Sequence, residues 1–156
     1  MADLNYNEHK GSPLLYLRED KVKQSLNMFF NVSKNFERII LEKIEGDIFG
    51  IADIRCLLII NLNPGIIFNQ LMEELDVSKQ SLNRVLKKLI KDKYIIQKIN
   101  SKDGRKKNLF LSNQTNKVLD NILEPLVNEI SNVFQKSGSN SVQGFNQIIT
   151  NILNRN

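Results

Sequence analysis

Residue types that bind metals or form disulfides are nearly absent from this sequence. Its 156 residues include one cysteine, one histidine and no tryptophan. The single cysteine, Cys56, excludes an intrachain disulfide framework and is typical of a reducing compartment, so we expect a cytoplasmic protein. The histidine, His9, has no second histidine or cysteine at metal-ligand spacing, so we predict no metal site.

Long apolar runs and enzyme motifs are missing as well. The densest apolar run, residues 56–60, is far too short to cross a bilayer, and the N-terminal region has no apolar stretch of signal-peptide length. The chain has no nucleophile elbow, P-loop or paired-histidine motif. Its paired glutamates (Glu42 with Glu45, Glu73 with Glu74) are predicted to be surface carboxylates of helices. We therefore expect no enzyme activity, no cofactor and no membrane contact.

Cys56 has two interpretations, a redox sensor or a buried structural thiol. It is followed by the apolar run Leu-Leu-Ile-Ile, and Arg55 is its only local cation. Reactive thiols lie in exposed, electropositive surroundings, whereas this environment is apolar. The pattern favours a buried, unreactive thiol.

Positive charge is concentrated in one segment. Residues 76–111 contain eleven lysines and arginines against three aspartates, a local net charge of +8, whereas the whole chain carries +5. A charge run is often only a solvated face, but a cationic segment of this density also attracts a polyanion, with nucleic acid as the first candidate. The charge alone leaves these two interpretations about even.

Apolar periodicity predicts helices on both sides of a turn. A long amphipathic helix is expected over about 13–44, and a helix of this length usually packs against a partner chain as well as its own core. Asp53 is the predicted N-cap of a short apolar helix through about 61, and a further helix follows over 68–75. After a tight turn, Ser78 is predicted to cap a helix that ends near Lys93.

After this helix the spacing of apolar residues changes to that of β-strands, which predicts a β-hairpin. Further helices are predicted after the hairpin. Strands are expected over 94–99 and 108–111, around a turn at Asp103-Gly104. Ser112 or Asn113 should cap a second long helix, which Pro125 should kink. A linker is predicted at 137–141 and a last amphipathic helix over 142–153.

The helix after Ser78 has the residue distribution of a DNA-reading helix. At about 100° per residue, its apolar residues from Leu82 to Ile90 gather on one side, and Gln80, Arg84, Lys87 and Lys91 gather on the other. Glutamine, asparagine and arginine make bidentate contacts with base edges, and lysine reaches phosphates. Alone, this helix is more typical of an ordinary amphipathic helix. Together with the preceding short helix and the basic hairpin, it predicts DNA binding.

The segment 64–112, PGIIFNQLMEELDVSKQSLNRVLKKLIKDKYIIQKINSKDGRKKNLFLS, resembles the winged-helix core of MarR-family transcription regulators. The shared features are VSK at 77–79, DGR at 103–105 and LS at 111–112. Two segments are similar to a PetP-like branch of that family: SKQSLNRVLKKL and, near the N-terminus, LYLREDKV. The chain departs from the family pattern at Thr115, where the family often has glycine, and at Ala52-Asp53, where it usually has a threonine cap.

The resemblance implies a mainly α fold with a small β-hairpin wing: a mobile tail (1–12), an N-terminal dimerisation helix (13–45), a winged helix-turn-helix core (46–112) and C-terminal dimerisation helices (113–156). It implies a homodimer on a pseudo-palindromic operator in double-stranded DNA, and release from DNA by a small-molecule effector of unknown identity, as in many members of that family. It also implies that Arg105 enters the minor groove, held by an ion pair with Asp103.

The residues predicted to bind DNA lie on the helix after the turn and in the hairpin: Ser78, Lys79, Gln80, Ser81, Asn83, Arg84, Lys87, Lys88, Lys102, Arg105, Lys106 and Lys107. Asp103 and Gly104 are predicted to shape the wing. The alternative function is a winged helix used as an architectural or protein–protein interaction module, with its basic residues serving solubility. A steep salt dependence and a preferred DNA sequence would distinguish DNA binding from this alternative.

Overall fold

A computed structural model of the chain describes residues 15–44, 48–101 and 103–154. The chain divides into two compact units, residues 1–38 and 39–156, which are described separately below. The predicted tail at 1–12, with His9, and the predicted DNA contact Lys102 lie outside the described residues.

The first unit is dominated by one long helix. A short 3₁₀ turn, η1 (Leu15–Leu17), precedes α1 (Glu19–Lys43), which confirms the predicted N-terminal helix. None of the α1 residues is buried, and several of its large apolar side chains are exposed: Val22, Leu26, Met28, Phe29, Phe30 and Val32. The part of this helix that lies in the first unit therefore exposes most of the apolar stripe that its sequence predicts, and its last residues belong to the second unit.

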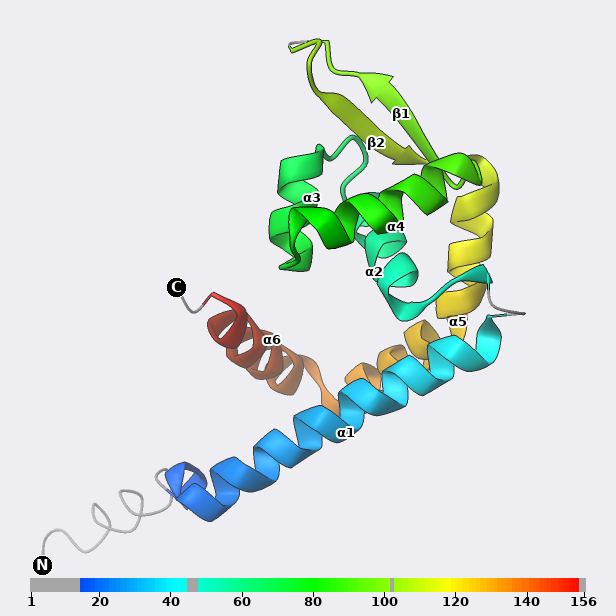
Figure 1. Ribbon diagram of the computed structural model, residues 1–156. Coiled ribbons are helices and arrows are strands. Elements are labelled where there is room, and N and C mark those ends of the chain that lie inside the picture. The colour runs from blue at the N-terminus through cyan, green and yellow to red at the C-terminus, as the bar shows by residue number, and fades with distance from the viewer. Residues whose placement is uncertain (1–14, 45–47, 102, 155–156) are drawn as a thin grey trace, which may run out of the picture. The chain divides into compact units, whose positions relative to one another are not determined.

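Three short helices form the centre of the second unit (Figure 1): α2 (Ile51–Leu62), α3 (Phe68–Leu75) and α4 (Lys79–Lys91). All three were expected, although α4 ends before Lys93. Their inward side chains form an apolar core, with these residues almost wholly buried: Ile54, Cys56, Leu57, Ile60, Leu71, Leu82 and Leu89. Burial of this stripe leaves the opposite side of α4 in solvent.

The start of α2 differs from the sequence-based prediction. Gly50, and not Asp53, is the N-cap residue. Asp53 lies in the first turn, where its Oδ2 accepts the backbone N–H of Gly50 at 2.9 Å. An acidic residue at this third position satisfies a free N–H and interacts favourably with the helix N-terminus, so it stabilises the helix without being its cap.

A two-stranded hairpin projects from one end of this core, as Figure 1 shows, and confirms the predicted wing. Strands β1 (Ile95–Ile99) and β2 (Lys107–Leu111) are antiparallel, with Ile95 opposite Leu111 and Ile99 opposite Lys107. The loop between α2 and α3 joins this sheet, because Leu109 donates its N–H to the carbonyl of Ile66 at 2.9 Å and accepts the N–H of Gly65 at 2.8 Å. The root of the hairpin is therefore tied to the helices.

Ser112 begins the C-terminal helices, as predicted. Its Oγ accepts the N–H of Thr115 at 3.2 Å, which caps α5 (Asn113–Ser137). Thr115, where the family that the sequence resembles often has glycine, is 1% exposed and donates its hydroxyl to the carbonyl of Tyr94 at 2.9 Å. The departure from the family pattern thus adds a link between α5 and the residue that precedes β1.

The two C-terminal helices are longer than predicted. Pro125 lies inside α5, whose ribbon changes direction between its two halves (Figure 1). The prediction of a five-residue linker at 137–141 is wrong: only Gly138, at φ +77°, separates α5 from α6 (Ser139–Leu153). Glycine adopts this left-handed backbone without strain, so one residue suffices for the turn. In the described part of the chain, no helix is both long and apolar enough to span a bilayer.

Candidate nucleic-acid interface

The exposed side of α4 is oriented by a turn and a cap. Asp76 has a left-handed backbone, with φ +49°, and ends α3. Ser78 then accepts the N–H of Ser81 at 3.2 Å through its Oγ, as predicted. The hydroxyls of Ser78 and Ser81 are also hydrogen-bonded to each other at 3.0 Å. These two predicted DNA contacts therefore also build the first turn of the helix.

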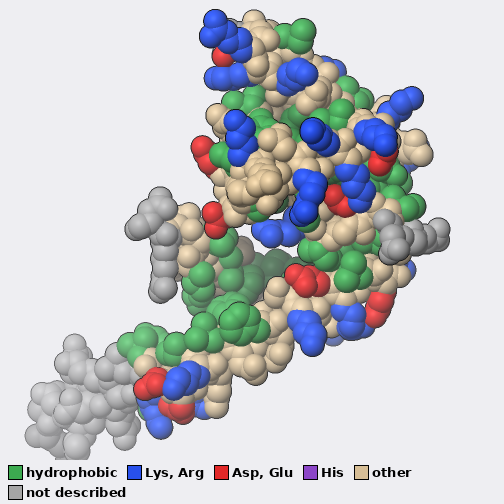
Figure 2. All heavy atoms as spheres, viewed as in Figure 1, with side chains coloured by type: hydrophobic (Ala, Val, Ile, Leu, Met, Phe, Trp, Pro, Cys, Tyr) green, Lys and Arg blue, Asp and Glu red, His purple; other side chains and the backbone are tan. Residues whose placement is uncertain are grey.

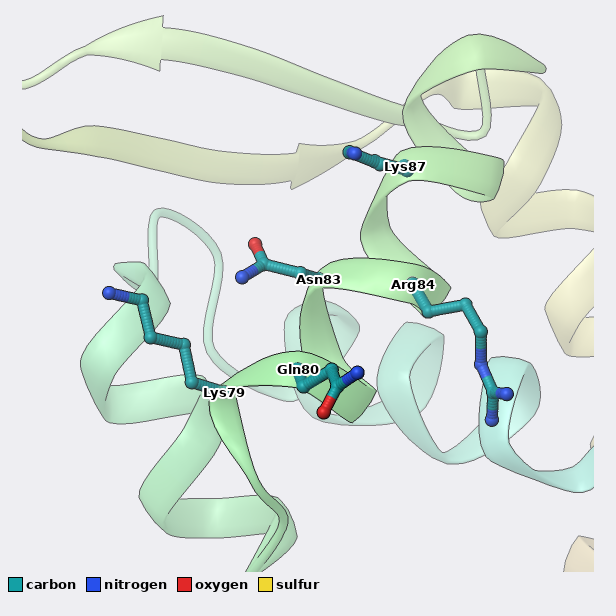
Figure 3. A pocket seen from close by; sticks show the side chains of 5 residues that line it. All are labelled: Lys79, Gln80, Asn83, Arg84 and Lys87. Carbon is teal, nitrogen blue, oxygen red and sulfur yellow. The ribbon is translucent and has the colours of Figure 1, made fainter.

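Five of the predicted residues come together on this side of α4. A shallow hollow of about 560 Å³ is lined by Lys79, Gln80, Asn83, Arg84 and Lys87, all of them exposed. Figure 3 shows Lys87 directed toward the hairpin and Arg84 directed away from it. Asn83 lies between Lys79 and Lys87, and Gln80 lies between Lys79 and Arg84. Hydrogen-bonding amides are thus flanked by cations, the arrangement suited to base edges bordered by phosphates.

The hairpin and α3 form a second cationic hollow, of about 310 Å³. It is lined by Arg105, Lys106 and Lys107 of the wing, together with Asn69 and Gln97. Asn69 and Gln97 were not among the predicted residues. The register of the hairpin explains why Gln97 lines this hollow. Gln97 lies opposite Leu109 and thus shares the face of the sheet that meets the helices. Asn69, from α3, meets the wing only through tertiary packing.

The turn of the wing departs from the expected ion pair. The Asp103 carboxylate accepts the backbone N–H of Arg105 at 3.1 Å and lies 3.5 Å from Lys106 Nζ. The expectation that Asp103 holds the guanidinium of Arg105 is therefore wrong. Within the described residues Asp103 shapes the backbone under Arg105, helped by the Asn100 amide, which accepts the Asp103 N–H at 3.0 Å and donates to Asn108 at 2.8 Å. Aspartate and asparagine favour such local turns.

Lys88 lies apart from the hollow on α4. Its Nζ is 2.6 Å from Oδ2 of Asp53 on α2, and the two side chains are 41% and 9% exposed. The predicted role of Lys88 in binding DNA thus competes with an intramolecular ion pair. Asp53 was predicted only as a cap, because nothing in the sequence indicates a partner 35 residues away.

Lysine and arginine side chains dominate one face of the second unit. Figure 2 shows them spread over α4 and the hairpin, with few acidic side chains among them. The strong local charge of the 76–111 segment is therefore displayed on a common surface, and the apolar halves of the same elements face inward. Such a surface attracts a polyanion.

Cys56 is on the inward side of α2. It is 0% exposed, and burial, with a smaller contribution from the Asp53 carboxylate, raises the pKa of its thiol to about 12. Both effects disfavour the thiolate, which is the reactive form. The structure therefore supports the interpretation of Cys56 as an unreactive thiol.

We expect thiol reagents at about pH 8 to label native Cys56 far more slowly than the same residue in unfolded protein, because both burial and the raised pKa suppress the thiolate. Mass spectrometry of samples quenched at intervals measures the two rates. Rapid labelling of the native protein, together with peroxide-dependent loss of DNA binding, would contradict this prediction and indicate a redox sensor.

Comparison with known proteins agrees with this geometry. A sequence profile of the MarR family matches residues 50–106, from the cap of α2 into the hairpin. The HTH-type transcriptional regulator PetP of Rhodobacter capsulatus is 28% identical over 144 residues, which cover 89% of this chain and 84% of PetP.

Two solved structures show the same fold. Staphylococcus aureus MarR in complex with salicylate and kanamycin matches with a TM-score of 0.70 at 16% identity, over 90% of this chain and 98% of that one. A mutant of S. aureus MepR bound to an oligodeoxyribonucleotide matches with a TM-score of 0.57 at 15% identity, over 83% of this chain and 95% of that one. The architecture is therefore a winged helix-turn-helix.

Proposed function

We propose that the chain is a transcription regulator of the MarR type, and that it binds a pseudo-palindromic operator in double-stranded DNA as a homodimer. The match to the MarR family over residues 50–106 and the similarity to PetP support this proposal. The observation that carries this proposal is the hollow on α4, where two amides and three cations gather on the exposed side of a helix whose other side is buried. The MepR mutant of the same fold, which is bound to an oligodeoxyribonucleotide, supports it.

Base recognition is assigned to α4. Gln80, Asn83 and Arg84 offer the fork-shaped donors and acceptors that pair with adenine and guanine edges in the major groove. Lys79 and Lys87 flank them in the same hollow and are assigned to phosphates, which set affinity and register without reading sequence.

The wing is assigned to the neighbouring groove and backbone. Arg105 follows the turn at Asp103-Gly104, and its side chain is exposed. A guanidinium is favoured in a narrow minor groove, where the negative potential is strongest. Lys106 precedes β2 and lies beside the Asp103 carboxylate, whereas Lys107 begins the strand. We assign at most one of them to that groove and the other to the DNA backbone.

Dimerisation is assigned to the helices outside the core. The apolar side chains of α5 and α6 that remain exposed in a single chain include Val127, Val133, Phe145, Ile148, Ile152 and Leu153. Exposed apolar surface of this kind marks an interface. A two-fold dimer places its recognition helices one helical turn of DNA apart, about 34 Å.

Regulation and location complete the proposal. S. aureus MarR, which shares the fold, was solved with salicylate and kanamycin, and release of DNA by a small-molecule effector is proposed here on that likeness. Since the proposed target is chromosomal DNA, the proposed location is the cytoplasm.

The decisive experiment recovers and sequences the genomic fragments that the purified protein binds. The proposal expects a shared palindromic sequence and a steep loss of affinity between low and moderate salt, since several phosphates are contacted. Binding without a preferred sequence would instead favour an architectural module. The absence of any DNA binding would favour a protein–protein interaction module.

We expect Arg105→Ala to reduce affinity more for an operator with AT-rich flanks than for the same operator with GC-rich flanks, because AT-rich tracts narrow the minor groove. Titrations of both proteins against both duplexes at a single salt concentration measure the difference. Asp103→Ala, which removes the acceptor of the Arg105 N–H, should show part of the same effect. Equal losses on both flanks would make the wing a general phosphate contact, and no loss would mean that Arg105 does not reach DNA.

A further inference from the structure

The carboxylate of Asp53 connects the first turn of α2 to the recognition helix α4. Its Oδ2 accepts the N–H of Gly50 at 2.9 Å and lies 2.6 Å from Nζ of Lys88. We propose that Asp53 and Lys88 position α4 for base recognition, so that Lys88 acts through the orientation of the helix and does not contact phosphate. This inference rests on the proposed function, because it concerns the same DNA-reading surface.

The apolar core determines which side of α4 faces outward, but it sets the exact rotation of the helix less sharply. Leu82, Leu86 and Leu89 hold α4 against the core, but apolar burial has no preferred direction. A charge-assisted hydrogen bond is short and directional. The pair between Asp53 and Lys88 therefore adds the directional contact that the leucines lack.

Small rotations of α4 matter at its outer side. Side chains extend about 5–6 Å from a helix axis, so a rotation of about 10° moves their ends by about 1 Å. A preorganised site tolerates displacements of only about 0.5 Å. Lys88 lies one helical turn after Arg84, so the ion pair holds the helix next to a side chain assigned to base recognition.

The geometry also distinguishes Lys88 from its neighbour Lys87. Lys87 lines the hollow on α4, and among the described residues no ion pair is recorded for it. Lys88 instead has an acceptor that is 9% exposed. A carboxylate that remains buried without its cation is costly, so the pair is expected to persist when DNA binds.

Paired variants of the full-length protein test the inference. Lys88→Met keeps the apolar stem of the side chain, and Asp53 still has the Gly50 N–H, so this variant is expected to fold. We expect it to lose operator affinity by about fivefold or more, with affinity for an unrelated duplex and the salt slope unchanged. Lys87→Met is the control, which should weaken binding to both duplexes and reduce the slope by about one per half-site.

A double-mutant cycle and a conservative variant separate orientation from charge. Asp53→Asn retains an acceptor for the Gly50 N–H but removes the carboxylate, and it should reproduce the loss seen for Lys88→Met. The double variant should lose no more than either single variant, because one contact underlies both effects. Lys88→Arg can still pair with Asp53, so it should retain the operator preference that Lys88→Met loses.

Three outcomes overturn the inference. A reduced salt slope for Lys88→Met, as for Lys87→Met, would show that Lys88 binds phosphate. Lower thermal stability with an unchanged ratio of operator to non-specific affinity would show that the pair serves folding alone. A wild-type protein without sequence preference would contradict the proposed function together with this inference, and that result is visible before any variant is made.

Discussion

Glutamates introduced together at Phe145 and Ile148 are expected to convert the proposed homodimer into a monomer. These side chains are 47% and 56% exposed, and with Ile152, at 44%, they occupy one face of α6. Phe145 also adjoins Phe134 of α5, with ring centroids 6.3 Å apart, so the apolar face continues across both helices. Burying two carboxylates in such an interface without partners is strongly unfavourable.

Loss of the dimer should reduce operator affinity by about a hundredfold or more. Each monomer would bind one half-site, and the gain from linking two binding events would disappear. Light scattering at micromolar concentration measures the oligomeric state, and titration with operator DNA measures the affinity. The matched control is Asn146→Glu with Gln147→Glu, which adds the same charge at exposed positions on the other side of α6.

Two results would contradict this expectation. A wild-type protein that is monomeric at micromolar concentration would remove the dimer from the proposed function. A glutamate variant that remains dimeric would show that the interface lies elsewhere, with the exposed apolar side chains of α1 as the next candidate.

Arg84→Ala is expected to weaken operator binding by about 1–3 kcal/mol per half-site, or roughly five- to 150-fold, and to relax the preference at one base position. Arg84 is exposed and lines the hollow on α4. It also borders a smaller hollow, of about 260 Å³, beside Ala52 and Arg55 at the start of α2. Within the described residues no carboxylate is recorded as its partner, so its donors remain available to guanine.

A panel of operators with single base changes distinguishes base contact from charge. Arg84→Ala should lose discrimination at one position of each half-site, while Lys87→Ala should weaken all duplexes by a similar factor. If Arg84→Ala also weakens every duplex equally, Arg84 is a phosphate contact, and base recognition depends on Gln80 and Asn83.

Much of the fold was predictable because its signals are local. The bounds of α3 and the caps at Ser78 and Ser112 follow from periodicity and from hydroxyls that satisfy free N–H groups. The grouping of Gln80, Arg84 and Lys87 on one side of α4 follows from the angle between successive residues of a helix. The hairpin is indicated by the change of period around Asp103-Gly104.

Local sequence signals gave the wrong residue where two neighbouring residues both suited the same role, as a helix cap or as the partner of an ion pair. Gly50 and Asp53 both suit the start of α2, and the structure uses glycine as the cap and aspartate as its partner. Asp103 has both Arg105 and Lys106 within reach, and its carboxylate pairs with the lysine. The serine- and glycine-rich segment at 137–141 was predicted as a linker, although α5 and α6 need only Gly138 between them.

The sequence by itself determined the winged-helix class and the side of α4 that faces outward, because both depend on residues at most a few positions apart. Tertiary structure alone decided the partners of side chains from different elements. Lys88 has the charge and spacing of a phosphate contact, yet packing of α4 against α2 places its ammonium beside Asp53, 35 residues earlier. Helical periodicity gives the direction in which a side chain leaves the axis of its helix. It carries no information about which other helix packs on that side.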